Sequence, residues 1–137
     1  MAFRPVNYET GKLVLMPCAN TQTITKGDCL VDNGSGYLAV ATVSTAVDIH
    51  YVAMQTVLTT ATGQLVLCIE TENVLFEADC DAAWATANQG TYVDLATVAT
   101  IDPDAVTNEL FYLLKGIGVT AVGTKVLGFF TRGIPNT

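Results

Sequence analysis

Short apolar runs separated by turn-forming residues recur along the chain, and this spacing constrains the fold more than any other feature of the sequence. The stretch GDCLVDNGSGYLAV (27–40) holds two such runs on either side of a polar, glycine-rich segment. Asn33-Gly34 within that segment is the residue pair preferred in a tight β-hairpin turn, where both residues adopt positive φ. The stretch therefore predicts two short strands joined by a hairpin.

Similar runs continue toward the C-terminus. About nine strands at intervals of roughly eight to twelve residues are typical of an all-β sandwich or closed barrel. The pattern predicts a small all-β barrel or sandwich. We expect its strands in KLVLMPC (12–18), DCLV (28–31), GYLAVA (36–41), IHYVAMQTV (49–57), QLVLCIE (64–70), NVLFEA (73–78), GTYVDLA (90–96), LFYLLKGI (110–117) and KVLGFF (125–130).

Two segments carry weak helix signals. The segment DAAWATAN (81–88) begins with an aspartate that can cap a helix, and in DPDAVTNEL (102–110) an aspartate precedes a proline, which is favoured at the first helical position. Each segment is expected to form either a helical turn or an ordered loop. The predicted fold class is all-β with at most one or two short helical turns.

The first eleven residues differ in kind from the rest of the chain, because proline, glycine and charged residues interrupt any strand pattern there. We expect residues 1–11 to form an extended N-terminal arm outside the barrel, and residues 12–137 to form a single barrel domain. Such an arm contributes little to folding and becomes ordered on a neighbouring protein by strand addition. The residues predicted to contact that neighbour, including one near the other terminus, are Phe3, Arg4, Val6, Tyr8 and Arg132.

The chain has more apolar residues than one small core needs. Hydrophobic residues make up 50% of the sequence and charged residues only 14%. We expect part of this apolar surface to meet a partner or another copy of the chain. The candidates for the core or for an oligomer interface lie near the last predicted hairpin and are Phe111, Tyr112, Phe129 and Phe130.

Charge is distributed unevenly along the chain, whose net charge is −7. Residues 27–114 contain twelve carboxylates and neither Lys nor Arg. Nucleic-acid affinity depends on Lys and Arg side chains that neutralise phosphates, so this acidic body argues against a nucleic-acid partner.

The segment between Asp48 and Glu70 has no charged residue and is long enough to span a bilayer. Its repeated Thr and Gln residues suit strands and turns better, so a membrane partner is not expected. The N-terminus lacks the apolar region of a secretory signal peptide, which predicts synthesis and folding in a cytoplasm.

The four cysteines, Cys18, Cys29, Cys68 and Cys80, fit no metal-site spacing, and the chain has a single histidine. In a reducing compartment they are expected to be buried free thiols that behave as small hydrophobic residues. One disulfide is the alternative, and spacing does not identify its members.

The segments that most resemble catalytic motifs have structural interpretations. A catalytic Cys–His pair with His50 would need an acid or amide side chain to orient the histidine, and the sequence does not identify one. Glu77, Asp79 and Asp81 alternate as the solvated face of a strand and the loop after it would, although they could also bind a cation or act as paired carboxylates. We expect no catalytic residue and no cofactor, with Glu77, Asp79 and Asp81 as the alternative cation site.

Three stretches, TITKGDCLVDNGSGYLAVATVSTA, VLFEADCDAAWATANQGTYVDLA and KVLGFFTRG, together resemble the small decoration, or cement, proteins of tailed-bacteriophage capsids. That family has a polar stretch leading to a "tkGD" step and a hairpin, a "v-F-E-A-D" strand, a "G-t-x-v-D-l" strand and a closing strand. The matching segments here are Lys26-Gly27-Asp28, Phe76-Glu77-Ala78-Asp79, Gly90-Thr91-Tyr92-Val93-Asp94-Leu95 and Lys125-Val126-Leu127.

The resemblance implies a small β-barrel of the β-tulip type with an N-terminal arm and no enzyme activity. It also implies attachment to the major capsid protein on the outer surface of the virion, as a homotrimer at three-fold or quasi-three-fold sites. Two alternatives stay open: another phage structural role, such as a head-fibre base, neck or tail-tube component, and a small-molecule-binding barrel or carboxylate-dependent hydrolase.

Overall fold

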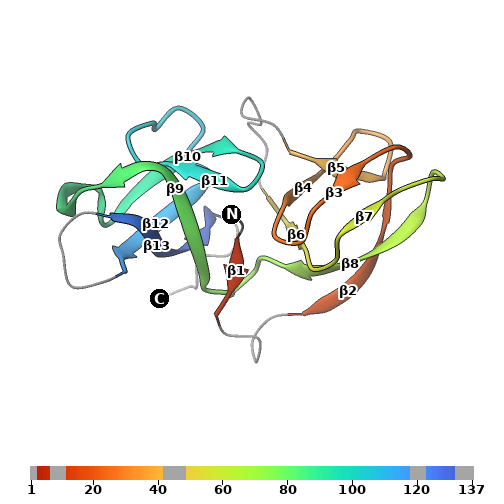
Figure 1. Ribbon diagram of the computed structural model, residues 1–137, viewed down its shortest axis with the longest axis horizontal. Coiled ribbons are helices and arrows are strands. Elements are labelled where there is room, and N and C mark those ends of the chain that lie inside the picture. Colours follow the sequence, from red (N-terminus) through yellow and green to blue (C-terminus); the bar gives the residue numbers. More distant parts are fainter. Residues whose placement is uncertain (1–2, 7–11, 42–48, 118–122, 132–137) are drawn as a thin grey trace.

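Two small β-barrels lie side by side in the computed structural model of the protein (Figure 1), which describes residues 3–6, 12–41, 49–117 and 123–131. The all-β fold class is therefore confirmed. The sequence analysis expected one barrel over residues 12–137, whereas the described residues of that range form two closed sheets. Among the described residues, no helix is long and apolar enough to cross a membrane.

The first barrel is formed by the N-terminal half of the chain. Its closed sheet has the strand order β2-β5-β4-β6-β8. A two-stranded sheet of β3 and β7 accompanies it. The bounds are β2 (Leu13–Cys18), β3 (Thr23–Ile24), β4 (Cys29–Asp32), β5 (Leu38–Val40), β6 (Tyr51–Ala53), β7 (Val57–Leu58) and β8 (Gln64–Glu70).

The second barrel is formed by the C-terminal half, in the order β9-β11-β10-β12-β13, and it closes because β13 also pairs with β9. The short strand β1 adds to β9 in antiparallel register. The bounds are β1 (Arg4–Pro5), β9 (Phe76–Trp84), the 3-10 helix η1 (Thr86–Asn88), β10 (Thr91–Thr97), β11 (Thr100–Asp102), β12 (Phe111–Gly116) and β13 (Gly123–Phe130).

The predicted hairpin is confirmed in the first barrel, with a longer turn than a two-residue Asn-Gly connection. Strands β4 and β5 pair in antiparallel register from Leu30–Val40 to Asp32–Leu38, and residues 33–37 connect them. Gly34 and Gly36 have φ of 91° and 89°, a region that glycine adopts without a steric penalty. The Asp32 carboxylate accepts the Gly34 N–H at 2.7 Å and fixes the turn.

The two weak helix signals have different outcomes. Residues 81–84 continue strand β9, and only Thr86–Asn88 form a turn of 3-10 helix. The segment 103–110 is an ordered loop, because the Asp94 carboxylate accepts the backbone N–H groups of Thr107, Asn108 and Glu109 at 3.0, 2.6 and 2.7 Å. A buried carboxylate from the neighbouring strand thus satisfies donors that a helix would have satisfied internally.

One hydrophobic cluster runs continuously through both barrels. It contains Cys29, Val52 and Ile69 from the first barrel together with Val93 and Leu113 from the second. The backbone also joins the barrels, since the Cys29 N–H donates to the Val98 carbonyl at 3.0 Å. A second, smaller cluster fills the first barrel alone. The barrels therefore share a core.

The N-terminal segment is part of this shared core, so the prediction of an arm outside the barrel is wrong for residues 3–6. Phe3 is 1% exposed, and its ring centroid lies 4.9 Å from that of Phe130 and 5.6 Å from that of Phe111. Its N–H donates to the Gly27 carbonyl in the first barrel. Phe3 packs there because an aromatic ring inside the second barrel buries apolar surface that an exposed arm would leave in water.

Two of the four predicted oligomer-interface residues also belong to the core. Phe111 and Phe130 are fully buried in the chain and pack edge to face, with ring centroids 5.2 Å apart. Of the two alternatives expected from the sequence, core or interface, these two residues take the core, because strands β12 and β13 turn them into the barrel. Tyr112 and Phe129 are cross-strand partners on the other face and are half-exposed, so their role as interface residues stays a prediction.

Candidate functional site

The outer face of strands β2 and β8 carries an exposed apolar surface. Cross-strand partners in the register of these strands share a face, and Leu15 is opposite Leu67 while Pro17 is opposite Leu65. Leu13, Leu15 and Leu65 are 53%, 59% and 55% exposed. We name these three residues the leucine face. Large apolar side chains gathered on one exposed face of a protein indicate a surface that contacts another molecule.

The alternate residues of the same two strands point into the first barrel. Val14, Met16 and Cys18 belong to or pack against its core cluster, as do Val66 and Cys68. Both faces of β2 are thus apolar, although only one of them is covered. A strand with one solvated face usually alternates apolar and polar residues. The run KLVLMPC does not, because leucines of the leucine face stand at its outward positions.

Strand β2 is paired on one side only over most of its length. Six of its residues pair with β8, from Leu13–Ile69 to Cys18–Gln64. On the other side, its pairing with β5 is the single pair Cys18–Leu38. The described part of the chain therefore leaves β2 with a free edge before Cys18.

The hydrogen-bond pattern shows which backbone groups lie at this edge. The Glu70 N–H donates to the Lys12 carbonyl at 3.0 Å, so Lys12 and Glu70 form a hydrogen-bonded pair. The antiparallel alternation then directs the N–H and C=O groups of Leu13 and Leu15 away from β8 and toward the free edge. Unpaired strand edges of this kind are templates for adding a further strand.

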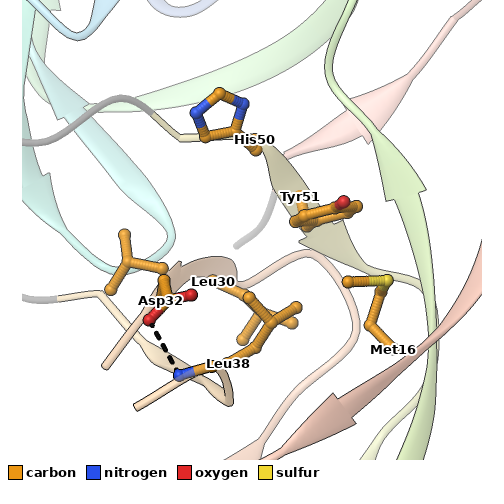
Figure 2. Close-up of a pocket in the computed structure, with 8 residues that line it drawn as sticks. Met16, Leu30, Asp32, Leu38, His50 and Tyr51 are labelled. Atoms are coloured by element: carbon orange, nitrogen blue, oxygen red, sulfur yellow. Dashed lines mark hydrogen bonds between the residues drawn. The ribbon is translucent and has the colours of Figure 1, made fainter. Parts of the chain in front are cut away.

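A cavity of about 370 Å³ lies beside this edge, between β2 and the β4–β5 hairpin. Figure 2 shows Met16 of β2 on one side of the cavity and Asp32 of the hairpin on the other. Leu30, Leu38 and Tyr51 provide the apolar walls, and His50 and Asp32 are polar lining residues. Its volume lies in the range of roughly 300–1,000 Å³ that is usual for binding pockets.

The surroundings of the cavity are acidic. Asp32 and Glu72 are exposed, and Glu70 is half-exposed, with its carboxylate 3.8 Å from the Lys12 ammonium group. Burial, together with the nearby Glu70 carboxylate, raises the pKa of Tyr51, so its hydroxyl group is neutral at pH 7. A cationic or neutral ligand is favoured over an anionic one at such a site.

The acidic cluster proposed from the sequence is an ion-pair network in the second barrel. Arg4 contacts Glu77 at 2.6 Å and Asp79 at 3.1 Å, and the Lys125 ammonium group contacts Asp79 at 2.7 Å. The side chain of Asp79 is 4% exposed, so the expectation of a solvated face is wrong for this residue. Strands β1 and β13 pair with β9 and bring Arg4 and Lys125 next to its carboxylates. The alternation of residues within β9 does not reveal these distant partners.

The pKa shifts in this network follow from burial and charge. Burial lowers the pKa of Arg4, but the hydrogen bonds to Asp79 and Glu77 and the negative charges of these two carboxylates together raise it above its ordinary value. Asp81 is exposed and is not a member of the ion pairs of Arg4 and Lys125 given above. Partial burial and the nearby carboxylate of Asp102 raise its pKa. Among the described residues, no group of three His, Cys, Asp or Glu side chains is placed to hold a metal ion.

All four cysteines are buried free thiols, as the sequence analysis expected. Burial raises the pKa of Cys68 and of Cys80 to about 12, and it raises the pKa values of Cys18 and Cys29 as well. Thiols that stay protonated at pH 7 are poor nucleophiles. These cysteines therefore serve as packing residues.

Three of the five predicted capsid-contact residues lie within the described structure. Phe3 and Arg4 are held by the second barrel, and Val6 is 51% exposed next to them. Tyr8 and Arg132 lie outside the described residues. The sequence analysis missed the leucine face, although an apolar run that ends at a strand-edge proline was visible in residues 12–18.

No protein-family model, curated protein or solved structure matches the chain.

Proposed function

We propose that this protein is a viral structural protein that binds the outer surface of a tailed-bacteriophage capsid and stabilises it. The observation that carries the proposal is the leucine face beside the free edge of β2. Exposed apolar side chains beside unpaired backbone groups suit docking on another protein. The capsid is the docking partner because of the sequence resemblance, and the major capsid protein is the component that would be contacted.

The charge of the chain supports an outer-surface position. Residues 27–114 carry twelve carboxylates and neither Lys nor Arg, and a phage genome lies inside the shell, where such a surface would be repelled. The hydrolase alternative rested only on the acidic cluster of Glu77, Asp79 and Asp81. Two of these three carboxylates, Glu77 and Asp79, are ion-paired with Arg4 and Lys125, which weakens that alternative.

Co-sedimentation with expanded capsids that lack the protein tests this proposal. Changing Leu15→Thr and Leu65→Thr together should weaken binding at least tenfold, which corresponds to about 1.4 kcal/mol. The matched control is Leu58→Thr with Val106→Thr, because these residues are 57% and 58% exposed on other parts of the surface. If the wild-type protein does not sediment with capsids, the proposed function is wrong; equal binding by both double variants would remove the leucine face as its basis.

The homotrimer is a separate part of the proposal. Tyr112 and Phe129 are the candidates for its interface that remain accessible, and the Tyr112 ring lies 5.0 Å from that of Tyr92, which is 40% exposed. Light scattering at micromolar concentration should report three copies. A monomer would contradict self-association in solution and leave the capsid-binding test unaffected.

A further inference from the structure

We propose that the gap between β2 and the β4–β5 hairpin receives an extended peptide segment of a partner protein, apolar at its centre and flanked by Lys or Arg. This inference rests on the proposed function and deepens it, because it assigns the chemistry of the contact. It is carried by three features of the described residues: a free strand edge, an adjacent cavity and an acidic rim.

The backbone at the edge can pair with an added strand. Leu13 and Leu15 direct their N–H and C=O groups into the gap. Pro17, two residues further along the same strand, also faces the gap but has no N–H group. The pair Cys18–Leu38 closes the gap immediately beyond. The edge therefore accommodates a short extended segment of about five residues, which is the strand-addition mode of peptide recognition.

The side-chain alternation of an added strand matches both faces of β2. A peptide residue beside Val14 or Met16 would point inward, where the cavity of about 370 Å³ lies against Met16. Residues beside Leu13 and Leu15 would point outward and cover the leucine face. The inward position therefore selects an apolar side chain that contacts Leu30, Leu38 and Tyr51.

Charge complementarity identifies the flanks of the peptide. Asp32 lines the cavity, and Glu70 and Glu72 lie at a neighbouring hollow, where Lys12 is the cation among the lining residues. Lys and Arg on the peptide would meet these carboxylates. A second copy of this chain that paired through its own β2 would bring the same acidic side chains to the gap, so like charges oppose that arrangement.

A displayed library of random nonapeptides tests the proposal without capsids. Peptides that bind the wild-type protein are kept, and those that also bind the Leu15→Pro variant are removed. This substitution removes an N–H group at the free edge of β2 but no hydrogen bond to β8. Pro17, two residues after Leu15 in the same strand, shows that proline is compatible with this edge. Leu15→Thr is the control that keeps the N–H group, and circular dichroism and thermal unfolding establish that both variants are folded.

The expected result is enrichment of peptides with an apolar centre and basic flanks. Their affinity should be at least tenfold lower on Leu15→Pro than on Leu15→Thr, because both variants lose the leucine side chain and only Leu15→Pro loses the N–H group. The selected peptide should also slow amide exchange at Leu13 and Leu15 of the wild-type protein, a readout that needs no variant. Asp32→Asn, which keeps an acceptor for Gly34, should weaken the basic peptides.

Several outcomes would overturn the proposal. One is that no peptides bind the wild-type protein better than the Leu15→Pro variant, and another is that acidic peptides are enriched. A third is slower amide exchange at Leu13 and Leu15 as the protein concentration rises in the absence of peptide. The last result would identify a second copy as the occupant. Capsid binding without any peptide binding would overturn this inference alone, whereas peptide binding without capsid binding would overturn only the proposed function.

Discussion

Asp79 shows how much a single side chain depends on contacts distant in sequence. Its carboxylate is nearly buried and is held by Arg4 from one end of the chain and Lys125 from the other. A buried carboxylate that loses one of two partners keeps its desolvation penalty without full compensation. Arg4 is therefore a stabilising residue of the second barrel, whatever the role of the N-terminus in binding.

Arg4→Ala should lower the free energy of unfolding by about 1–3 kcal/mol. The matched control is Lys12→Ala, which removes a cation that is 79% exposed and 3.8 Å from Glu70; its effect should stay below about 0.5 kcal/mol. Urea unfolding at pH 7 measures both. Equal effects of the two substitutions would show that the ion-pair network does not stabilise the barrel.

Asp28 is a second residue whose environment sets its charge. Burial raises the pKa of its carboxyl group above the ordinary value of 3.8, and the hydrogen bond from the Thr25 N–H opposes this only in part. A carboxyl group with a raised pKa binds protons more readily in the folded state. Its contribution to stability is therefore greatest below the unfolded pKa and declines as the pH rises through the folded pKa.

This sign predicts a pH-dependent difference between the wild-type protein and Asp28→Asn. As the pH rises from 3.8 through the raised pKa, the wild-type protein should lose stability relative to the variant, whose side chain does not titrate. Unfolding by urea at a series of pH values measures the difference. A constant difference across the series, or one of the opposite sign, would contradict the assignment of burial as the dominant cause.

At the scale of elements, the contact between β12 and β13 depends on a glycine. Gly128 is opposite Leu113, and a Cβ atom at Gly128 would clash with the Tyr112 carbonyl oxygen and the Phe111 ring. The ring of Phe111 is fully buried and packs against the rings of Phe3 and Phe130. The strand pair therefore closes the second barrel only with glycine at this position.

Gly128→Ala should destabilise the protein by about 1–3 kcal/mol, the usual cost of overpacking a core. Thr124→Ala on the same strand is the control, because Thr124 is exposed, and its effect should be below about 0.5 kcal/mol. Thermal unfolding measures the comparison. A Gly128→Ala variant as stable as Thr124→Ala would mean that β12 and β13 separate more easily than their register indicates.

At the scale of the whole molecule, the continuous hydrophobic cluster predicts that the two barrels unfold together. Phe3 contributes to that cluster and its backbone bonds to the first barrel. Phe3→Ala should cost about 3–5 kcal/mol, and deletion of residues 1–5 should cost at least as much. Removing the N-terminal segment therefore lowers stability, contrary to the expectation for an independent arm.

Calorimetry on the wild-type protein and on Phe3→Ala measures this cooperativity. One transition, shifted to lower temperature in the variant, is expected. Val6→Ala is the control, since Val6 is half-exposed, and it should shift the transition little. Two separate transitions in the wild-type protein would show that the barrels fold independently despite their shared cluster.

The sequence by itself determined the all-β class, most of the strands and the burial of the cysteines. Alternation, turn residues and apolar runs are local properties, so they survive in the sequence without knowledge of the fold. Segments such as 64–70 and 111–116 formed strands where they were expected. The hairpin around Gly34 followed from local turn chemistry, namely a glycine with positive φ beside Asp and Asn.

Only the tertiary structure decided the number of barrels, the burial of Phe3 and the partners of Asp79. Each of these depends on pairing between segments far apart in the chain, such as β1 with β9 and β13 with β9. The candidate site has the same origin. The run 12–18 predicts a strand, but its free edge exists because β5 meets it at a single pair. Leu15 is exposed because the core of the first barrel covers the other face of the strand.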